Sequence, residues 1–320
     1  MSLKRPAAKL TLDGRSLTAA EAALASVTVE LSVSGAHDRV VCRLGLLSPF
    51  VDVEAGADAK LELGYGDELV AVLTGAVTAV ERAPEGLVVE ALAGTAPLST
   101  TRLGASYVDQ SVGDVVGDLA SNAGVSTGEV SAPQRLSAYH VDERRSVWTH
   151  VRQLARLAGC ELSSDPDGAL NFRPVKTGAA DHRLRHGAEL VAWDVGPRDA
   201  DRPEVEVAPF GAASEKGSEK WHIVLREPEG PSPSGPVLVP AALRDRDGAE
   251  AFAQALAAAV SRSAKAGTLI AVGDGSIRAG DLVELQEMPS GEDGLLRVTS
   301  AAHVVSGGGF RTALSVEGVA

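Results

Sequence analysis

The sequence predicts a β-rich α+β fold, with a strand-rich block at each end and an α+β domain between them. Apolar residues alternate at period two in the first hundred residues and again toward the C-terminus, as in half-buried strands. Between these blocks, at 111–124 and 146–159, apolar residues recur at helical spacing. We therefore expect a strand-rich domain at 1–103, either an antiparallel barrel or a sandwich, an α+β domain at 104–179 and a second strand-rich domain at 180–320.

The composition supports many short strands. Hydrophobic residues make up 44% of the 320 residues, which is enough for a large core. Only 3% are aromatic, so Val, Ala and Leu must build that core. The 34 glycines and 16 prolines suit frequent turns between strands.

The charge and the cysteines exclude several classes of protein. A formal net charge of −13 argues against nucleic-acid binding, which needs clustered Lys and Arg. Cys42 and Cys160 lie far apart in the chain and predict free thiols, not a disulfide framework. No signal peptide and no run of about 18 apolar residues is found. We expect a protein that folds in the cytoplasm and does not insert into membranes.

The first block contains five clear strand patterns. "SVTVELSV" at 26–33 alternates apolar and polar residues, with Val27, Val29, Leu31 and Val33 on one face. "YGDE" at 65–68 has the composition of a tight hairpin turn. The other strands are expected at 39–46, 59–66, 68–83 and 86–94.

The middle block predicts two capped helices and a hairpin. In the first helix Ser111 is the expected N-cap and Gly124 the stop. In the second, Ser146 and Gly159 have the same roles. "CELSSDPDGALNF" then predicts a hairpin, because "DPDG" is a favourable turn sequence.

The last block returns to strands after a long connection. A long loop is expected at 197–240, with two possible strands inside it at 204–208 and 220–225. An alanine-rich helix follows at 249–266. Further strands are expected at 182–196, 268–272, 281–286, 295–305 and 310–316.

Two glycine motifs do not have the context that their chemistry needs. "GVSTG" at 124–128 matches the nucleophile elbow of serine hydrolases, but it follows a helix and opens a loop, so Ser126 is not a predicted nucleophile. "VGDGSIRAG" at 272–280 begins like a dinucleotide-binding loop, yet it has Arg278 where the third glycine belongs. We interpret it as a turn between two strands.

The histidines and cysteines predict no reactive or metal site. His182 and His186 are four residues apart, but their surroundings are not helical, so we expect exposed loop histidines. "SSDPDG" lacks the later ligands of a calcium loop. We expect Cys160 to be a small buried hydrophobe, Trp148 to fill the gap between helix and sheet, and His150 to be solvated. No catalytic, cofactor-binding or metal-binding residue is predicted.

Three stretches, in this order, carry a resemblance to a known family. The first is "LELGYGDELVAVLTGAVTAVE" at 61–81. The second runs from "YVDQSVGDVVGDLASNAGV" through "RSVWTHVRQLARLAGCELSSDPDGALNFRP" at 107–174. The third is the alanine-rich helix with "GTLIAVGDGSIRAGDLVEL" at 267–285. Together they resemble the late-control-protein-D family, the baseplate hubs of contractile phage tails and contractile injection systems.

This resemblance implies a structural, non-enzymatic role. Family members form homotrimeric rings that adapt a sixfold tail tube to a threefold spike. Each copy supplies two similar small antiparallel β-barrels, and the resemblance implies that 1–103 and 180–320 are these two β-barrels, with the α+β domain at 104–179 beside the first. The implied partners are the tube protein, a separate spike protein and other baseplate proteins, with no cofactor. A separate spike is expected because no stem of repeated strands follows Val316. The implied location is the cytoplasm during assembly, and then the tail or injection particle.

Two other functions stay open at this point. A tail-associated cell-wall hydrolase would use a pair of carboxylates, of which the 43 Asp and Glu residues offer many. A carbohydrate- or oligomer-binding barrel would need exposed aromatic residues, and the sequence has three Trp, three Tyr and five Phe.

The sequence departs from the family at 197–240, where the connection is longer and richer in proline than the family's usual one.

Overall fold

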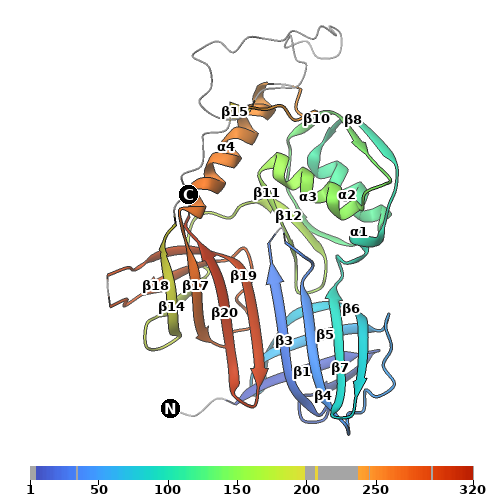
Figure 1. Cartoon of the computed structure of the whole chain (residues 1–320), viewed down its shortest axis with the longest axis vertical. Helices are drawn as coiled ribbons and strands as arrows, with labels where there is room; N and C mark the ends of the chain where they lie inside the picture. Colours follow the sequence, from blue (N-terminus) through green and yellow to red (C-terminus); the bar gives the residue numbers. More distant parts are fainter. Residues whose placement is uncertain are drawn as a thin grey trace.

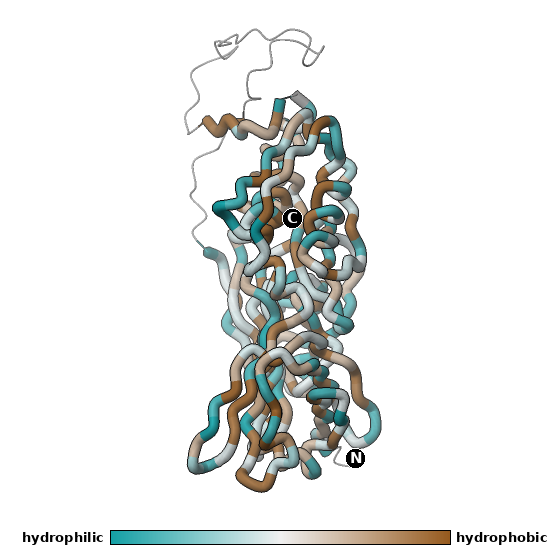
Figure 2. Tube along the Cα trace, turned by 90° about the vertical axis from the view of Figure 1, so that its right-hand side faces the viewer, coloured by the Kyte–Doolittle hydropathy of each residue, from teal (hydrophilic) through white to brown (hydrophobic). Residues whose placement is uncertain are grey.

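A computed structural model describes residues 5–33, 35–198, 206–207, 237–244, 246–289 and 291–319. Figure 1 shows a broad β-sheet in the lower half and a helical unit above it. Figure 2 shows hydrophobic and hydrophilic residues alternating along the strands of the lower half, as the sequence predicts. No helix in the described ranges is long and apolar enough to cross a membrane.

The first half of the sheet follows the predicted strands closely. Val27, Val29 and Leu31 are buried on one face of their strand, and Gly66 turns the tight hairpin at a φ of 59°. Two N-terminal strands, at 6–12 and 15–18, were not predicted. The bounds are β1 Pro6–Leu12, β2 Arg15–Thr18, β3 Leu24–Ser32, β4 Arg39–Gly45, β5 Asp58–Tyr65, β6 Glu68–Ala83 and β7 Gly86–Ala93.

The α+β unit contains both predicted helices with the predicted caps. Ser111 Oγ accepts the Asp114 N–H at 3.0 Å, and Ser146 Oγ accepts the N–H of Thr149. Gly159 ends its helix in the left-handed conformation. The elements are α1 Pro97–Thr100, β8 Ala105–Ser111, α2 Val112–Asn122, β9 Thr127–Val130, β10 Arg135–Val141, α3 Val147–Ala158, β11 Cys160–Ser164 and β12 Leu170–Pro174.

The second half adds the remaining strands and one long helix. The predicted helix is present over Arg246–Ser263, with its start next to Asp247, and it ends three residues before the predicted 266. Most of the predicted loop 197–240 and the possible strand at 220–225 lie outside the described residues. The bounds are β13 His182–Arg185, β14 Leu190–Pro197, β15 Glu206–Val207, β16 Val237–Leu238, α4 Arg246–Ser263, β17 Lys265–Val272, β18 Leu282–Gln286, β19 Gly294–Ser306 and β20 Gly309–Glu317.

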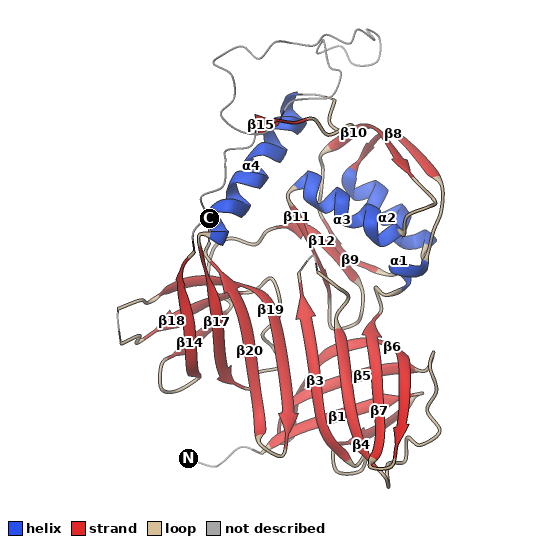
Figure 3. Cartoon of the chain, viewed as in Figure 1, coloured by secondary structure: helices blue, strands red, loops and turns tan. Residues whose placement is uncertain are grey.

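The strands do not form two closed barrels, which corrects the sequence prediction. Among the described strands, thirteen pair into a single sheet whose two halves join where β3 lies antiparallel to β19. In Figure 3 the strands β3, β4 and β7 stand side by side with alternating directions, and β1 and β5 cross behind them. An alternating pattern buries one face equally well in a barrel or in a curved open sheet, so the pattern alone does not distinguish them.

The two halves of the sheet repeat one topology. In the first half the strands pair in the order β3-β4-β7-β6-β5-β1. In the second half they pair in the order β14-β17-β20-β19-β18-β13, with the elements in the same chain order. The main difference is that β13 pairs parallel with β18, whereas β1 pairs antiparallel with β5. The chain therefore contains one sheet motif twice.

Two apolar clusters form the core. One lies within the sheet and includes residues from both of its halves. The other fills the α+β unit and also takes in Phe252 from α4. The alanine-rich helix therefore packs on the α+β unit, although the chain returns from it directly into β17.

We predict that Phe172→Ala lowers the free energy of unfolding by about 3–5 kcal/mol, because Phe172 is fully buried in the α+β core. Urea unfolding followed by circular dichroism measures this loss. The matched control is Val108→Ala on the exposed side of β8, which should change stability by less than about 0.5 kcal/mol. Equal effects of the two substitutions would contradict this packing.

Candidate functional site

The serine and histidine motifs of the sequence do not form a reactive centre. Ser126 lies exposed in the loop between α2 and β9, as expected. His182 is not in an exposed loop: it opens β13, is half-buried, and its Nε2 lies 3.1 Å from Asp281 Oδ2. That contact raises the pKa of His182. His186 instead packs edge-on against Trp193, so the two histidines have separate partners.

His150 is buried, which contradicts the predicted solvated position. Its Nδ1 lies 3.1 Å from the Tyr139 hydroxyl, and its Nε2 lies 3.2 Å from the backbone N and O of Asp142. The sequence places His150 on the polar side of α3, but β10 covers that side. A buried imidazole needs such partners, and here they are structural.

The two thiols and Trp148 also have structural surroundings. Burial raises the pKa of Cys42 to about 12 and that of Cys160 to about 11, so neither is an activated nucleophile. Cys160 is only half-buried. The Trp148 ring lies 4.3 Å from the ring of His37, so it does bridge α3 and the sheet. In the described ranges, no three His, Cys, Asp or Glu side chains are placed to hold a metal ion.

Arg278 joins the three parts of the chain. It lies in the turn between β17 and β18, as predicted for "VGDGSIRAG". Its Nη1 donates to Val72 O in β6 at 2.9 Å, and its Nη2 donates to Ser164 O in β11 at 3.0 Å. The guanidinium also lies 4.0 Å from the carboxylate of Asp38. One half-buried cation thus connects the second half, the first half and the α+β unit.

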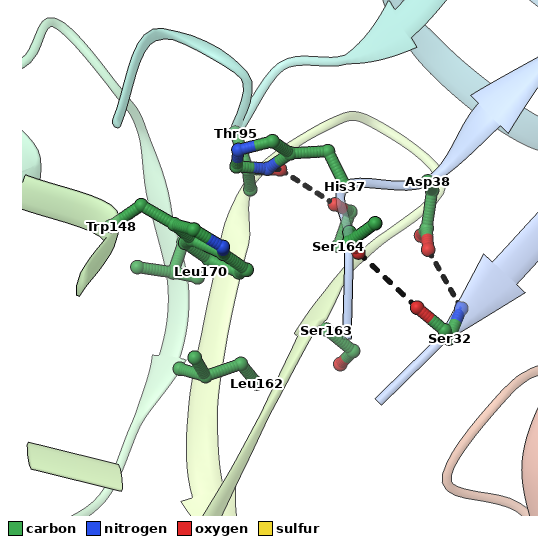
Figure 4. Close-up of a pocket in the computed structure, with 10 residues that line it drawn as sticks. Ser32, His37, Asp38, Thr95, Trp148, Leu162, Ser163, Ser164 and Leu170 are labelled. Carbon is green, nitrogen blue, oxygen red and sulfur yellow. Dashed lines mark hydrogen bonds between the residues drawn. The ribbon is translucent and has the colours of Figure 1, made fainter. Parts of the chain in front are cut away.

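Asp38 is the buried acid of this junction. Burial raises its pKa to about 6, although the Ser32 N–H and the Arg278 guanidinium favour the charged form. Figure 4 shows Asp38 pointing toward Ser32, with Trp148 across the pocket. The pocket has a volume of about 10 Å³, which is far too small for an organic substrate. The junction is therefore a structural contact.

A second buried charge cluster lies between the α+β unit and the second half. Glu161 of β11 pairs with Arg297 of β19, and both are almost fully buried. Arg297 Nη1 donates to Glu317 Oε1 at 2.7 Å, and Arg262 of α4 reaches the same oxygen at 3.1 Å. Breaking one partner of such a pair leaves an uncompensated buried charge, which is strongly destabilising. The cluster therefore fixes the α+β unit and α4 to the sheet.

The repeated topology extends to individual hydrogen bonds. In the first half, Gly56 N–H donates to Val77 O, and Val77 N–H donates to Ala57 O. In the second half, Gly280 N–H donates to Val298 O, and Val298 N–H donates to Asp281 O. Both glycines have nearly the same positive φ, 94° and 95°, which only glycine adopts readily. The matched sequences are "VEAG" at 53–56 and "IRAG" at 277–280.

The repeat also contains matched irregularities in the strands. β6 has a bulge at Thr78, whose hydroxyl donates to Glu90 O, and β19 has one at Thr299, whose hydroxyl donates to Ser315 O. β3 and β14 each shift register one residue after their first leucine, Leu24 and Leu190. Bulges are specific features, so these landmarks align the two halves residue by residue.

This alignment shows that one strand pairing of the sheet, between β19 and β3, has an equivalent that the described strands do not make. The C-terminal part of β19 pairs with β3 from the other half. The equivalent part of β6, at 79–83, has no such neighbour among the described strands. Within the part of the chain that the structure describes, β14, the counterpart of β3, also pairs on one side only. These two open edges are the candidate functional site, because unpaired edges are ready-made surfaces for association.

The open edge of β14 has a feature typical of edge strands. Arg198 N–H donates to Ala264 O on the β17 side, so the backbone of the preceding residue, Pro197, faces the open side. Proline has no N–H, and within sheets it is tolerated at such edges. Sequence reasoning did not identify which strands have open edges, and it missed the buried acids Asp38 and Glu161. The "VEAG" and "IRAG" pair was the available signal for the repeat.

Comparison with known proteins places the fold among phage tail proteins. The 43 kDa tail protein of prophage MuSo2 from Shewanella oneidensis aligns over 97% of this chain and 98% of its own, with a TM-score of 0.71 and 14% identity. A tail protein from Neisseria meningitidis MC58 aligns over 98% and 96%, with a TM-score of 0.74 and 14% identity. At such identities the likeness shows a common fold.

A secretion-system protein has a similar fold. An Escherichia coli component of the type VI secretion system, described as structurally similar to the T4 phage tail proteins gp27 and gp5, aligns over 98% of this chain and 77% of its own. Its TM-score is 0.63 and its identity 10%. No protein-family model and no curated protein matches the sequence. The predicted resemblance to tail proteins is thus confirmed for the fold.

We predict that acid stabilises the fold through Asp38. Its pKa in the folded protein, about 6, lies above its ordinary value of 3.8, so the folded state binds this proton more tightly than the unfolded state. The contribution is complete below about pH 4 and is lost as pH rises through 6. Since one pKa unit corresponds to about 1.4 kcal/mol, the loss amounts to about 3 kcal/mol.

Urea unfolding of the wild type and of Asp38→Asn between pH 4 and pH 7 measures this effect. The stability of the wild type relative to the variant should fall as pH rises. Burial lowers the pKa of His37 and His303 to about 4, which acts in the opposite direction, but both chains contain these histidines. A difference that does not change with pH would show that Asp38 is not buried as described.

Proposed function

We propose that this protein is a baseplate hub of a phage tail or contractile injection system, a structural protein of the late-control-protein-D type. Three copies form a ring that connects the sixfold tail tube to the threefold spike. The fold that it shares with tail proteins supports this proposal. The observation that carries it is the duplicated sheet motif with matching open edges.

The duplication accounts for the change of symmetry. Each chain contains the sheet motif twice, so three chains present six near-equivalent units around one axis. A head-to-tail contact that closes after three copies forms such a ring. The open edge of β6 in one copy then meets the open edge of β14 in the next. This contact repeats between chains the joint that β19 and β3 make within the chain.

The joint within the chain predicts the register between copies. In β19 and β3, Ala302 lies opposite Glu30. Counted from the matched bulges, the counterpart of Ala302 is Glu81 and the counterpart of Glu30 is Gly196. We therefore place Glu81 of one copy opposite Gly196 of the next. Edge pairing of this kind supplies backbone hydrogen bonds for association.

The remaining partners follow from the same proposal. The ring would contact a tail tube protein on one side, a separate spike protein on the other, and further baseplate proteins around it. The chain would be made in the cytoplasm and would end in the assembled tail or injection particle. No chemical step is needed for this role, so the proposal assigns no catalytic, cofactor or metal residue.

The alternative, a tail-associated hydrolase, has less support from the described residues. It needs two carboxylates that face each other across a cleft. Of the two hollows described, one is lined by Asp38 as its single acid and the other by Glu292. A purified protein that clears peptidoglycan, and loses that activity on one Asp or Glu substitution, would favour the hydrolase.

We predict that the purified protein sediments as a trimer, at three times the chain mass of 32.8 kDa. We also predict that a chain carrying Glu81→Cys and Gly196→Cys forms disulfide-linked oligomers on mild oxidation. The Cβ position at Gly196 is open, so the cysteine fits there. Analytical ultracentrifugation and non-reducing gels measure the two outcomes.

The matched control carries Glu30→Cys and Ala302→Cys at the equivalent joint within the chain. It should oxidise inside one chain and run as a monomer on the gel. A stable monomer at micromolar concentration, or cross-links that form equally well from Ala79→Cys and Gly196→Cys, would contradict the proposed ring and its register.

A further inference from the structure

An exposed apolar loop connects β4 and β5. In the segment 46–52, called the docking loop below, Leu46 is 69% exposed, Leu47 92% and Val51 54%. Phe50 is buried in the apolar core of the sheet and anchors the loop there. Three large apolar side chains in one short exposed loop are typical of an interaction site.

The second half of the chain contains the equivalent loop, and its position shows what such a loop contacts. Val53 N–H donates to Phe50 O, just as Ile277 N–H donates to Asp274 O. The turns before the paired glycines match as well, so the two loops align without a gap up to Gly56 and Gly280. In this alignment the counterpart of Val51 is Gly275.

Gly275 lies against the first half of the same chain. A Cβ at this position would lie 3.1 Å from Val70 Cγ2 and 3.3 Å from Leu63 Cβ, on the hairpin of β5 and β6. Nearby, the rings of Phe310 and Tyr65 lie 5.6 Å apart. Within the chain, therefore, the loop of one sheet motif packs on the hairpin of the next motif.

The equivalent hairpin for the docking loop is the one between β18 and β19. Counted from the paired glycines, the counterpart of Leu63 is Glu287, which is exposed. Beside this hairpin is a hollow of about 300 Å³, whose apolar lining is provided by Trp193, Val195, Leu285 and Met288. No docking loop of the same chain fills it, because the loop belongs to the other half.

The strand residues around this hollow lack the cover that their counterparts have. Val27 and Val29 are the counterparts of Trp193 and Val195 in the alignment of β3 with β14, and both are fully buried. Trp193 and Val195 are only half-buried. Apolar side chains of β14 thus remain partly uncovered next to its open edge.

We propose that the docking loop of one copy inserts into the hollow beside β14 of the next copy, with Val51 against the hairpin at Glu287 and the two leucines over Trp193. This inference rests on the proposed ring and deepens it. The occupant is a second copy of this chain, because the contact that it repeats already exists once within the chain. The loop adds side-chain burial to a joint that strand pairing alone would hold with backbone hydrogen bonds.

The test compares the oligomeric state of three proteins by sedimentation velocity over a concentration series. They are the wild type, the double variant Leu47→Asp with Val51→Asp, and the control Val108→Asp on an equally exposed site of β8. We expect the double variant to associate at least tenfold more weakly than the wild type, and the control to associate normally. The urea midpoint of each monomer should be unchanged, since all three side chains are exposed.

A second measurement locates the contact. Chains carrying Val51→Cys are mixed with chains carrying Glu287→Cys and oxidised, so that only a contact between copies links the two variants. We expect a cross-linked dimer band, and no such band above background when Val108→Cys replaces Glu287→Cys.

The outcomes separate this inference from the hub proposal. A wild-type trimer that persists in the double variant, or a trimer without the cross-link, would overturn the docking contact and leave the ring intact. A wild type that remains monomeric would overturn both. A double variant that forms normal trimers but fails to bind a tail partner would show that the loop serves that partner, and would also overturn the inference.

Discussion

The antiparallel pairing of β3 with β19 is the contact on which the architecture depends. It joins two copies of one sheet motif into a continuous sheet and buries residues such as Val29 beneath it. The motif occurs twice, and among the described strands the joint occurs once, so the equivalent edges of β6 and β14 are left unpaired. Unpaired edges are a liability in a monomer, and a ring removes them by pairing each edge with a copy of its complement.

Buried charges hold the helical unit in place on this sheet. Arg278 reaches from the second half to backbone carbonyls of the first half and of β11, and Glu161 reaches back to Arg297. Burying a charged group without a partner costs free energy. These pairs therefore favour one relative arrangement of the two sheet halves and the α+β unit, and they add little net stability. The burial that raises the pKa of Asp38 follows from this arrangement and needs no catalytic role.

Local features of this fold were predictable from the sequence, and distant contacts were not. The caps at Ser111 and Ser146 and the turn at Gly66 depend on a few neighbouring residues, and the structure confirms them. The burial of His150 depends on Tyr139 of a separate strand, and the joining of β3 to β19 spans nearly the whole chain. Alternation identifies a strand and its buried face, but it does not identify the partner strand. This is why two closed barrels were predicted where one open sheet is found.

The central claim is that these open edges close head to tail into a ring of three chains with six similar sheet units. Electron microscopy of the purified assembly, viewed along its axis, tests it most directly. We expect a closed ring with an inner wall of six similar units and three α+β units around it. A twofold dimer in which like edges meet, or an isolated single chain, would contradict it.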